Sequence, residues 1–125
     1  ICDASYTTFM LQHWVRDRER GQRLPLELAI QMLTKTPAGL YGLRDRGVIE
    51  EGKKADINVI ALNDLALYMP YVANDLPTGA PRLLQRAEGY VATMVAGQLT
   101  SRNGHDTGAR PGRLVRSSAG TDKLV

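Results

Sequence analysis

The sequence predicts an α/β chain whose first part is helical and whose second part is built from β-strands. Three observations predict this order. Apolar residues recur at three-to-four spacing up to Leu33. Alternating β-type segments begin at Ile57. Between them, the stretch from Thr34 to Ala61 holds a helix start, glycine turns and a strand start, as expected of a junction between two unlike structures.

Three helices are expected in the first part. Tyr6 to Arg20 carries apolar residues on one side and arginines on the other, and Leu24 to Leu33 has Pro25 in its first turn. A short third helix from Pro37 to Tyr41 follows Thr36, whose side-chain oxygen suits an N-cap. None of these helices can bury its apolar face alone, so we expect them to pack against further structure.

The junction is divided by glycines. Gly42 is expected to end the third helix in a left-handed conformation. Gly47 and Gly52 suit tight turns with positive φ, and Asp56 can accept backbone N–H bonds just before a strand from Ile57 to Ile60.

The second part is less regular at first. Residues 61–78 contain two prolines and predict an irregular, partly extended segment, and residues 82–87 are a weak strand candidate. Tyr90 to Val95 is a stronger strand, which turns at Ala96-Gly97 and pairs with Gln98 to Ser101 as a hairpin. Residues 117–125 predict a disordered polar tail.

Charge and cysteine content limit the function classes. The formal charge is +3, but acidic residues lie among the basic ones, so we expect neither a nucleic-acid partner nor a basic binding stripe. No apolar run reaches the roughly 20 residues that span a bilayer, so no membrane association is expected. The single cysteine, Cys2, excludes an internal disulfide and favours a cytoplasmic location.

The junction also resembles a known family. The spacing T-x-x-P-A-x-x-x-G-L-x-D-R-G-x-I-x-x-G-x-x-A-D-x-x-V is similar to the point where the last helix of a metal-dependent amidohydrolase barrel returns to a small β-sandwich. The matching residues are Thr34, Pro37, Ala38, Gly42, Leu43, Asp45, Arg46, Gly47, Ile49, Gly52, Ala55, Asp56 and Val59.

Flanking motifs resemble one branch of that family, the D-aminoacylases or N-acyl-D-amino-acid deacylases. These motifs are Arg16-Asp17, Pro25-Leu26-Glu27, Gly89-Tyr90, Val95-Ala96-Gly97, Asn103-Gly104, Thr107-Gly108 and Pro111-Gly112-Arg113. The resemblance covers about Asp3 to Arg116 and implies a hydrolase that cleaves the linear amide of an N-acyl-D-amino acid.

The resemblance implies a fold and a division of labour. Residues 1–46 would be the last helices of a (β/α)8 TIM barrel, and residues 47–116 a segment of the β-sandwich. The chain opens without methionine and without a targeting signal, so we expect it to be the C-terminal part of a longer protein. Zinc would be bound by ligands upstream of residue 1, the rest of the barrel would be the partner, and this chain alone would be inactive.

Few residues of this chain are candidates for chemistry, and no catalytic residue or metal ligand is expected in it. The resemblance places Asp3, Ser5 and Tyr6 on a loop at the rim of the active site. Asp3 could line the substrate, cap a helix or have a structural role, and metal ligation is the least favoured reading. His13 is expected to be packed or at the rim, and His105 to lie exposed in a turn. Arg82 and Arg86 could bind an acidic substrate, although surface salt bridges are favoured.

Two alternatives stay open. The parent could be a dihydropyrimidinase-like or other cyclic-amide hydrolase, against which the ending from Gly89 to Arg116 speaks. The chain could instead be a non-catalytic, β-rich interaction module, against which the exposed apolar helix faces speak.

Overall fold

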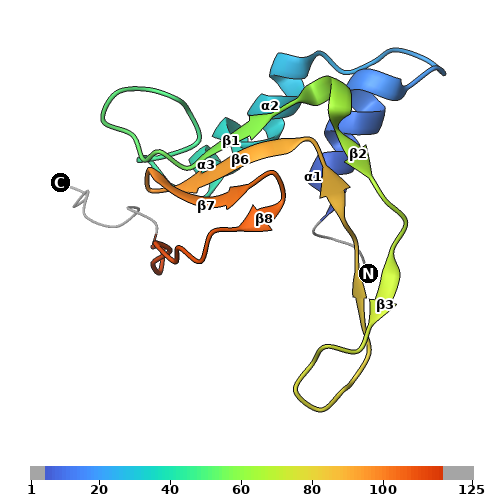
Figure 1. The fold of residues 1–125 in the computed structure, drawn as a ribbon. Coiled ribbons are helices and arrows are strands. Elements are labelled where there is room, and N and C mark those ends of the chain that lie inside the picture. The colour runs from blue at the N-terminus through green and yellow to red at the C-terminus, as the bar shows by residue number, and fades with distance from the viewer. Residues whose placement is uncertain (1–4, 117–125) are drawn as a thin grey trace.

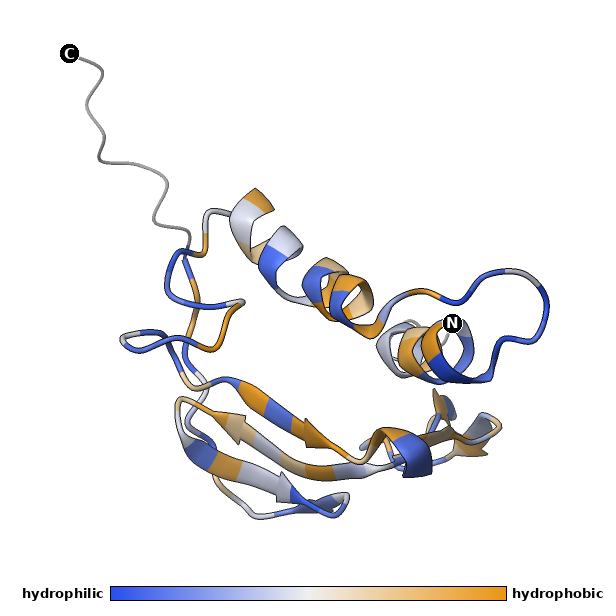
Figure 2. Cartoon of the chain, turned by 90° about the horizontal axis from the view of Figure 1, so that it is seen from above, coloured by the Kyte–Doolittle hydropathy of each residue, from blue (hydrophilic) through white to orange (hydrophobic). Residues whose placement is uncertain are grey.

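The computed structural model describes residues 5–116, which form a helical layer beside a β layer (Figures 1 and 2). The helices are α1 (Tyr6–Phe9), η2 (Met10–Asp17), α2 (Leu26–Leu33), α3 (Lys35–Leu40) and the short 3-10 turn η3 (Leu62–Asp64). The strands are β1 (Ile57–Ile60), β2 (Ala66–Leu67), β3 (Tyr71–Ala73), β4 (Arg82–Leu84), β5 (Ala87–Glu88), β6 (Tyr90–Val95), β7 (Gln98–Arg102) and β8 (His105–Asp106). The predicted order of helices before strands is confirmed.

The first predicted helix differs from the expectation. Instead of one α-helix from Tyr6 to Arg20, a single α-turn continues as the π-helix η2 and ends at Asp17. Its last bond runs from Arg18 N to His13 O, five residues apart (2.8 Å). Such a bond is one residue longer than the i→i+4 bond of an α-helix and defines the π-helical form. No helix in residues 5–116 has the length and apolar character needed to cross a membrane.

The start of the third helix also differs. Thr36 was expected to cap it, but α3 begins at Lys35 and its N-cap residue is Thr34. The Thr34 hydroxyl donates to the carbonyl of Ile30 at the end of α2 (2.7 Å). Thr34 therefore closes α2, and a single residue joins the two helices, which leaves no room for a separate cap at Thr36.

One antiparallel sheet, ordered β1-β6-β7-β8, forms the body of the β layer. The predicted strands from Ile57 and from Tyr90 have the expected bounds, and the predicted hairpin is formed by β6 and β7. Between η3 and Gly89 the chain forms a narrow arm, in which β2 pairs with β5 and β3 with β4 (Figure 1). Residues 61–78, expected to be irregular, thus contain β2 and β3, and the strand candidate at residues 82–87 contains β4 and the start of β5. Residues 5–116 contain no closed barrel, so the barrel and sandwich assignments stay predictions.

The core between the layers is small. Leu11 from η2, Ala29 from α2 and Leu65 after η3 form its buried centre, and Leu65 is 0% exposed. Many large apolar side chains elsewhere remain exposed, among them Leu40 (80%) and Ile49 (88%). The described residues therefore leave apolar surface available for packing against further polypeptide.

The turn between β6 and β7 gives a test of backbone strain. Ala96 has φ +50 and Gly97 has φ +78, and the Ala96 N–H donates to Asp56 Oδ1 (2.8 Å). We expect Ala96→Asn to raise the free energy of unfolding by up to about 1 kcal/mol, because asparagine tolerates positive φ better than alanine does. Urea denaturation measures the change. Asn103→Ala is the reciprocal control: Asn103 has φ +49 in the next hairpin, so that variant should be destabilised by a similar amount. If Ala96→Asn does not raise the free energy of unfolding, the assignment of backbone strain to Ala96 is contradicted.

Candidate functional site

The residues predicted to form the active-site rim are only partly within the described structure. Asp3 lies outside the described residues, as does Cys2. Ser5 is the N-cap residue of α1, and Tyr6, the first residue of that helix, is 64% exposed. Their role at a substrate rim therefore remains a prediction.

His13 is packed among aromatic rings. Its imidazole stacks on Phe9 with ring centroids 5.1 Å apart, and it meets the ring of Trp14 edge-on at 5.3 Å. The guanidinium carbon of Arg18 lies 4.4 Å from the centroid of the Trp14 ring. This cluster stabilises the end of η2 by ring packing and a cation–π contact.

The family-like junction is held together by charged side chains. Arg46 donates to Asp56 Oδ2 (2.9 Å) and to Asp45 Oδ1 (3.1 Å). The other Asp56 oxygen accepts the N–H of Ala96, which ties the junction to the turn of the β6–β7 hairpin. The hydrogen bond from Arg46 lowers the pKa of Asp45. These residues have structural partners, so this part of the motif ties the turn before β1 to the β6–β7 hairpin.

A second polar row joins the helical layer to the β layer. Thr8 is buried and its hydroxyl lies 2.7 Å from the hydroxyl of Tyr90, and Gln12 accepts the Leu67 N–H (2.8 Å). One turn further, Arg16 donates to the carbonyl of Leu62 (2.6 Å). Helix residues four apart lie on the same face, so these three side chains all bond to the β layer.

The Arg16-Asp17 pair, noted above as a feature of the deacylase branch, belongs to this row. Two hydrogen bonds join the guanidinium to the carboxylate (2.5 and 2.9 Å). They lower the pKa of Asp17 and raise that of Arg16. The pair therefore fixes the arginine for docking onto η3.

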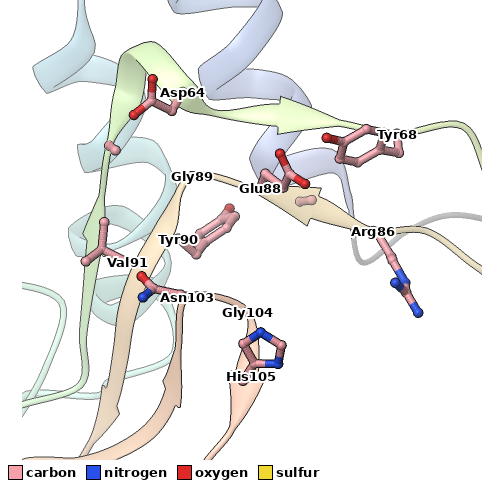
Figure 3. Close-up of a pocket in the computed structure, with 12 residues that line it drawn as sticks. Asp64, Tyr68, Arg86, Glu88, Gly89, Tyr90, Val91, Asn103, Gly104 and His105 are labelled. Atoms are coloured by element: carbon pink, nitrogen blue, oxygen red, sulfur yellow. The ribbon is translucent and has the colours of Figure 1, made fainter.

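A pocket of about 870 Å³ opens where the arm meets the sheet (Figure 3). One wall is the base of the arm, which contributes Tyr68, Arg86 and Glu88. The opposite wall is the β7–β8 turn with Asn103 and His105. This pocket gathers more ionisable side chains of both signs than the predicted rim does, and it is our candidate functional site.

Strand pairing places the side chains of the arm wall. Arg86 and Glu88 are two residues apart in an extended segment, so they point to the same face. Tyr68 lies opposite Arg86, since the Tyr68 N–H donates to the Arg86 carbonyl (3.0 Å), and small Ala66 lies opposite Glu88. A hydrogen bond to Glu88 raises the pKa of the Tyr68 hydroxyl.

The other wall depends on a two-residue turn. Asn103 (φ +49) and Gly104 (φ +77) join Arg102 to His105, the arrangement that Asn-Gly favours in tight hairpins. His105 is exposed, as expected for a turn residue, but the turn carries it to the pocket. The sequence predicts only an exposed turn residue at His105, and no motif marks Tyr68 or Glu88. The period-two spacing of Arg86 and Glu88 was the available signal.

Next to this turn, Asp106 gives a pH-dependent prediction. Two hydrogen bonds from Arg110 and one from the Gly108 N–H lower the pKa of Asp106 to about 2, from 3.8. Because the folded-state pKa is the lower one, the carboxylate contributes stability above pH 3.8, and this is lost as pH falls toward 2. Carboxyl-carbon NMR should give a midpoint near 2. Arg110→Gln should raise that midpoint, and an unchanged midpoint would show that the arginine is not responsible.

The described residues do not fit a metal centre. Among residues 5–116, no three His, Cys, Asp or Glu side chains gather as ligands for an ion. His13 stacks on aromatic rings, and His105 lies in the pocket with Glu88 and Asp64 without forming such a group. A metal of the kind implied by the resemblance would therefore need ligands from outside this segment.

Comparison with known proteins identifies the family. The family model described as the amidohydrolase family matches residues 2–101. The chain belongs to the amidohydrolase family. The resemblance carried by the junction is therefore confirmed at this level, and the junction, the helical layer and β6 all lie within the matched region of this amidohydrolase.

Curated relatives agree with this assignment but differ in activity. An allantoinase from Deinococcus radiodurans is 35% identical over 103 residues, which is 78% of this chain and 21% of the relative. A 5-methylthioadenosine/S-adenosylhomocysteine deaminase from Halothermothrix orenii is 39% identical over 51 residues, 41% of this chain and 12% of the relative. An alpha-D-ribose 1-methylphosphonate 5-triphosphate diphosphatase from Escherichia coli is 37% identical over 54 residues, 43% of this chain and 14% of the relative.

This amidohydrolase chain thus spans between 12% and 21% of the length of these relatives. No solved structure matches it. The names of the three relatives do not include a deacylase, so the assignment to the D-aminoacylase branch stays a prediction.

Proposed function

We propose that this chain is the C-terminal part of a zinc-dependent amidohydrolase that hydrolyses N-acyl-D-amino acids to a carboxylic acid and a free D-amino acid. The observation that carries the proposal is the family match over residues 2–101. The branch rests on the motifs that flank the junction, from Arg16-Asp17 to Pro111-Gly112-Arg113. A cytoplasmic location is part of the proposal.

Within that enzyme, the chain has a structural role. Asp45, Arg46 and Asp56 of the junction are engaged with one another, and Lys53 donates to the Arg44 carbonyl. The exposed apolar side chains of α2 and α3 support packing against the rest of the barrel domain; they are Leu26, Leu28, Ile30, Met32 and Leu40. The zinc ligands would lie upstream of residue 1, and the isolated chain would be inactive.

The test uses the full-length polypeptide that contains this chain, supplied with zinc. We expect release of the amino acid from N-acetyl-D-amino acids and little release from the L-enantiomers, whereas residues 1–125 alone should release none. Full activity of residues 1–125 alone would overturn the structural role. Equal turnover of both enantiomers, or of neither, would overturn the deacylase assignment.

A cyclic-amide hydrolase is the second candidate, and one observation favours it. The allantoinase aligns with 78% of this chain, a larger share than the deaminase or the diphosphatase covers. Allantoin is therefore included in the same assay. Turnover of allantoin without turnover of N-acetyl-D-amino acids would select this candidate. A non-catalytic interaction module would be selected if the full-length protein turned over neither and the isolated chain folded cooperatively as a monomer and bound a protein partner.

A further inference from the structure

The pocket at the base of the arm contains charged groups that its own structure does not neutralise. Arg86 directs Nε toward the Tyr71 hydroxyl (3.2 Å), which leaves its terminal nitrogens free to donate. Glu88 accepts from Tyr68 and retains further lone pairs. Arg86 and Glu88 share one face of the ribbon but form no ion pair with each other.

His105 adds a third polar group from the opposite wall. Figure 3 shows Arg86 and Glu88 on the arm, with the Glu88 carboxylate turned toward Tyr68, and His105 across from them at the β7–β8 turn; all three line the pocket. Imidazole can donate one N–H even when it is neutral. The pocket therefore offers two donors, Arg86 and His105, and one carboxylate acceptor, Glu88.

We infer that this pocket binds a free α-amino acid. Its carboxylate would accept hydrogen bonds from Arg86 and His105, and its ammonium group would donate to Glu88. The apolar side chain of the ligand would lie against the Tyr90–Val91 segment of β6, which also lines the pocket.

The mixture of charges selects this ligand class over simpler ions. A lone anion would be attracted by Arg86 but repelled by Glu88 and by Asp64, which also lines the pocket. A lone cation would be attracted by Glu88 and Asp64 but repelled by Arg86. A zwitterion can pair its carboxylate with Arg86 and its ammonium group with Glu88. An analogue with only one charged group leaves one of these pocket residues unpaired, and this difference gives the specificity.

This inference is independent of the proposed hydrolase activity, because it concerns binding alone. The experiment is isothermal titration calorimetry of the full-length polypeptide with racemic leucine. Two analogues each lack one charged group: 4-methylpentanoate has no amine, and 3-methylbutylamine has no carboxylate. We expect leucine to bind at least about tenfold more tightly than either analogue, since each loses a charge-assisted hydrogen bond.

Variants assign each end of the ligand. Arg86→Gln should weaken binding of leucine and 4-methylpentanoate by about tenfold and leave 3-methylbutylamine unchanged. Glu88→Gln should weaken binding of leucine and 3-methylbutylamine and leave 4-methylpentanoate unchanged. His105→Gln, at an exposed turn where folding is not at risk, should weaken leucine and 4-methylpentanoate binding.

Matched controls are Arg20→Gln and Glu51→Gln, which alter exposed residues outside the pocket and should change nothing. Circular dichroism and the melting temperature confirm that each variant is folded. Three results would overturn the inference. The first is that leucine binds no more tightly than its analogues, and the second is that no saturable binding is observed. The third result is an unchanged leucine affinity in Arg86→Gln, Glu88→Gln and His105→Gln.

Discussion

Replacing Gly89 with alanine is expected to lower the free energy of unfolding by about 2–5 kcal/mol. Gly89 has φ +92, a conformation that costs an L-residue about 1–2 kcal/mol. A Cβ at this position would lie 2.6 Å from Leu65 Cα and 2.8 Å from Leu65 N. These are backbone atoms of a residue that is fully buried, so the chain would have to move apart at its core, at a further cost of about 1–3 kcal/mol.

Gly104→Ala is the matched control for Gly89→Ala. Gly104 has a similar φ of +77, but nothing lies within 4 Å of the position of an added Cβ. Gly104→Ala should therefore lower the free energy of unfolding by the backbone strain alone, which is about 1 kcal/mol. The difference between the two variants in urea denaturation measures the close approach of Gly89 to Leu65. Equal losses of unfolding free energy in the two variants would show that Gly89 does not approach Leu65 closely.

The close approach at Gly89 also has a consequence for the pocket. The carbonyl of Gly89 accepts the Ala61 N–H (2.8 Å), and the residue joins β5 of the arm to β6 of the sheet. Displacing Leu65 would thus shift Glu88 relative to His105. The conformation of one glycine sets the geometry of both the core and the candidate site.

How much of this fold the sequence predicts depends on where the determining contacts lie. The β6–β7 hairpin was predicted because its signals are local: alternating β-formers and a two-residue turn at Ala96-Gly97. In the arm, only residues 82–87 were predicted as a possible strand, because Pro70 and Pro77 interrupt the pattern before them and side chains fix the pairing. Arg82 bonds Asp75 across the tip (2.5 and 2.6 Å), and Gln85 donates to the Tyr68 carbonyl (2.8 Å).

The π-helix and the pocket lay beyond sequence analysis for a related reason. The helical segment from Tyr6 to Asp17 is bonded to the β layer by Thr8, Gln12 and Arg16, whose partners are 46 to 82 positions away. The pocket depends on sheet order, which brings the β7–β8 turn beside the arm. Residue type alone identified neither His105 nor Glu88, since each is ordinary in its own segment.

Replacing Gly47, in the family-like junction, is expected to have the second large effect on the free energy of unfolding. A second substitution, Ala38→Gly, can test the cause of this effect. Gly47 has φ +89, and a Cβ there would lie 2.6 Å from the Cβ of Ala38 and 3.1 Å from the Thr34 carbonyl oxygen. Gly47→Ala should therefore lower the free energy of unfolding by about 2–3 kcal/mol, from backbone strain and overpacking. Gly52→Ala, with φ +84 and open space around it, should cost only about 1 kcal/mol.

The nearest atom at Gly47 belongs to a side chain, whereas at Gly89 it belongs to the backbone, and this difference is measurable. Ala38→Gly removes the clashing methyl group but costs about 1 kcal/mol in the helix. The double variant should lose about 1 kcal/mol less than the sum of the single variants. Additive losses would place the constraint at the Thr34 carbonyl instead. Either way, the spacing of Ala38, Gly47 and Asp56 is explained by packing of α3 against the turn that delivers Arg46 to Asp56. The most specific motif of this amidohydrolase chain thus reports how its two layers are joined.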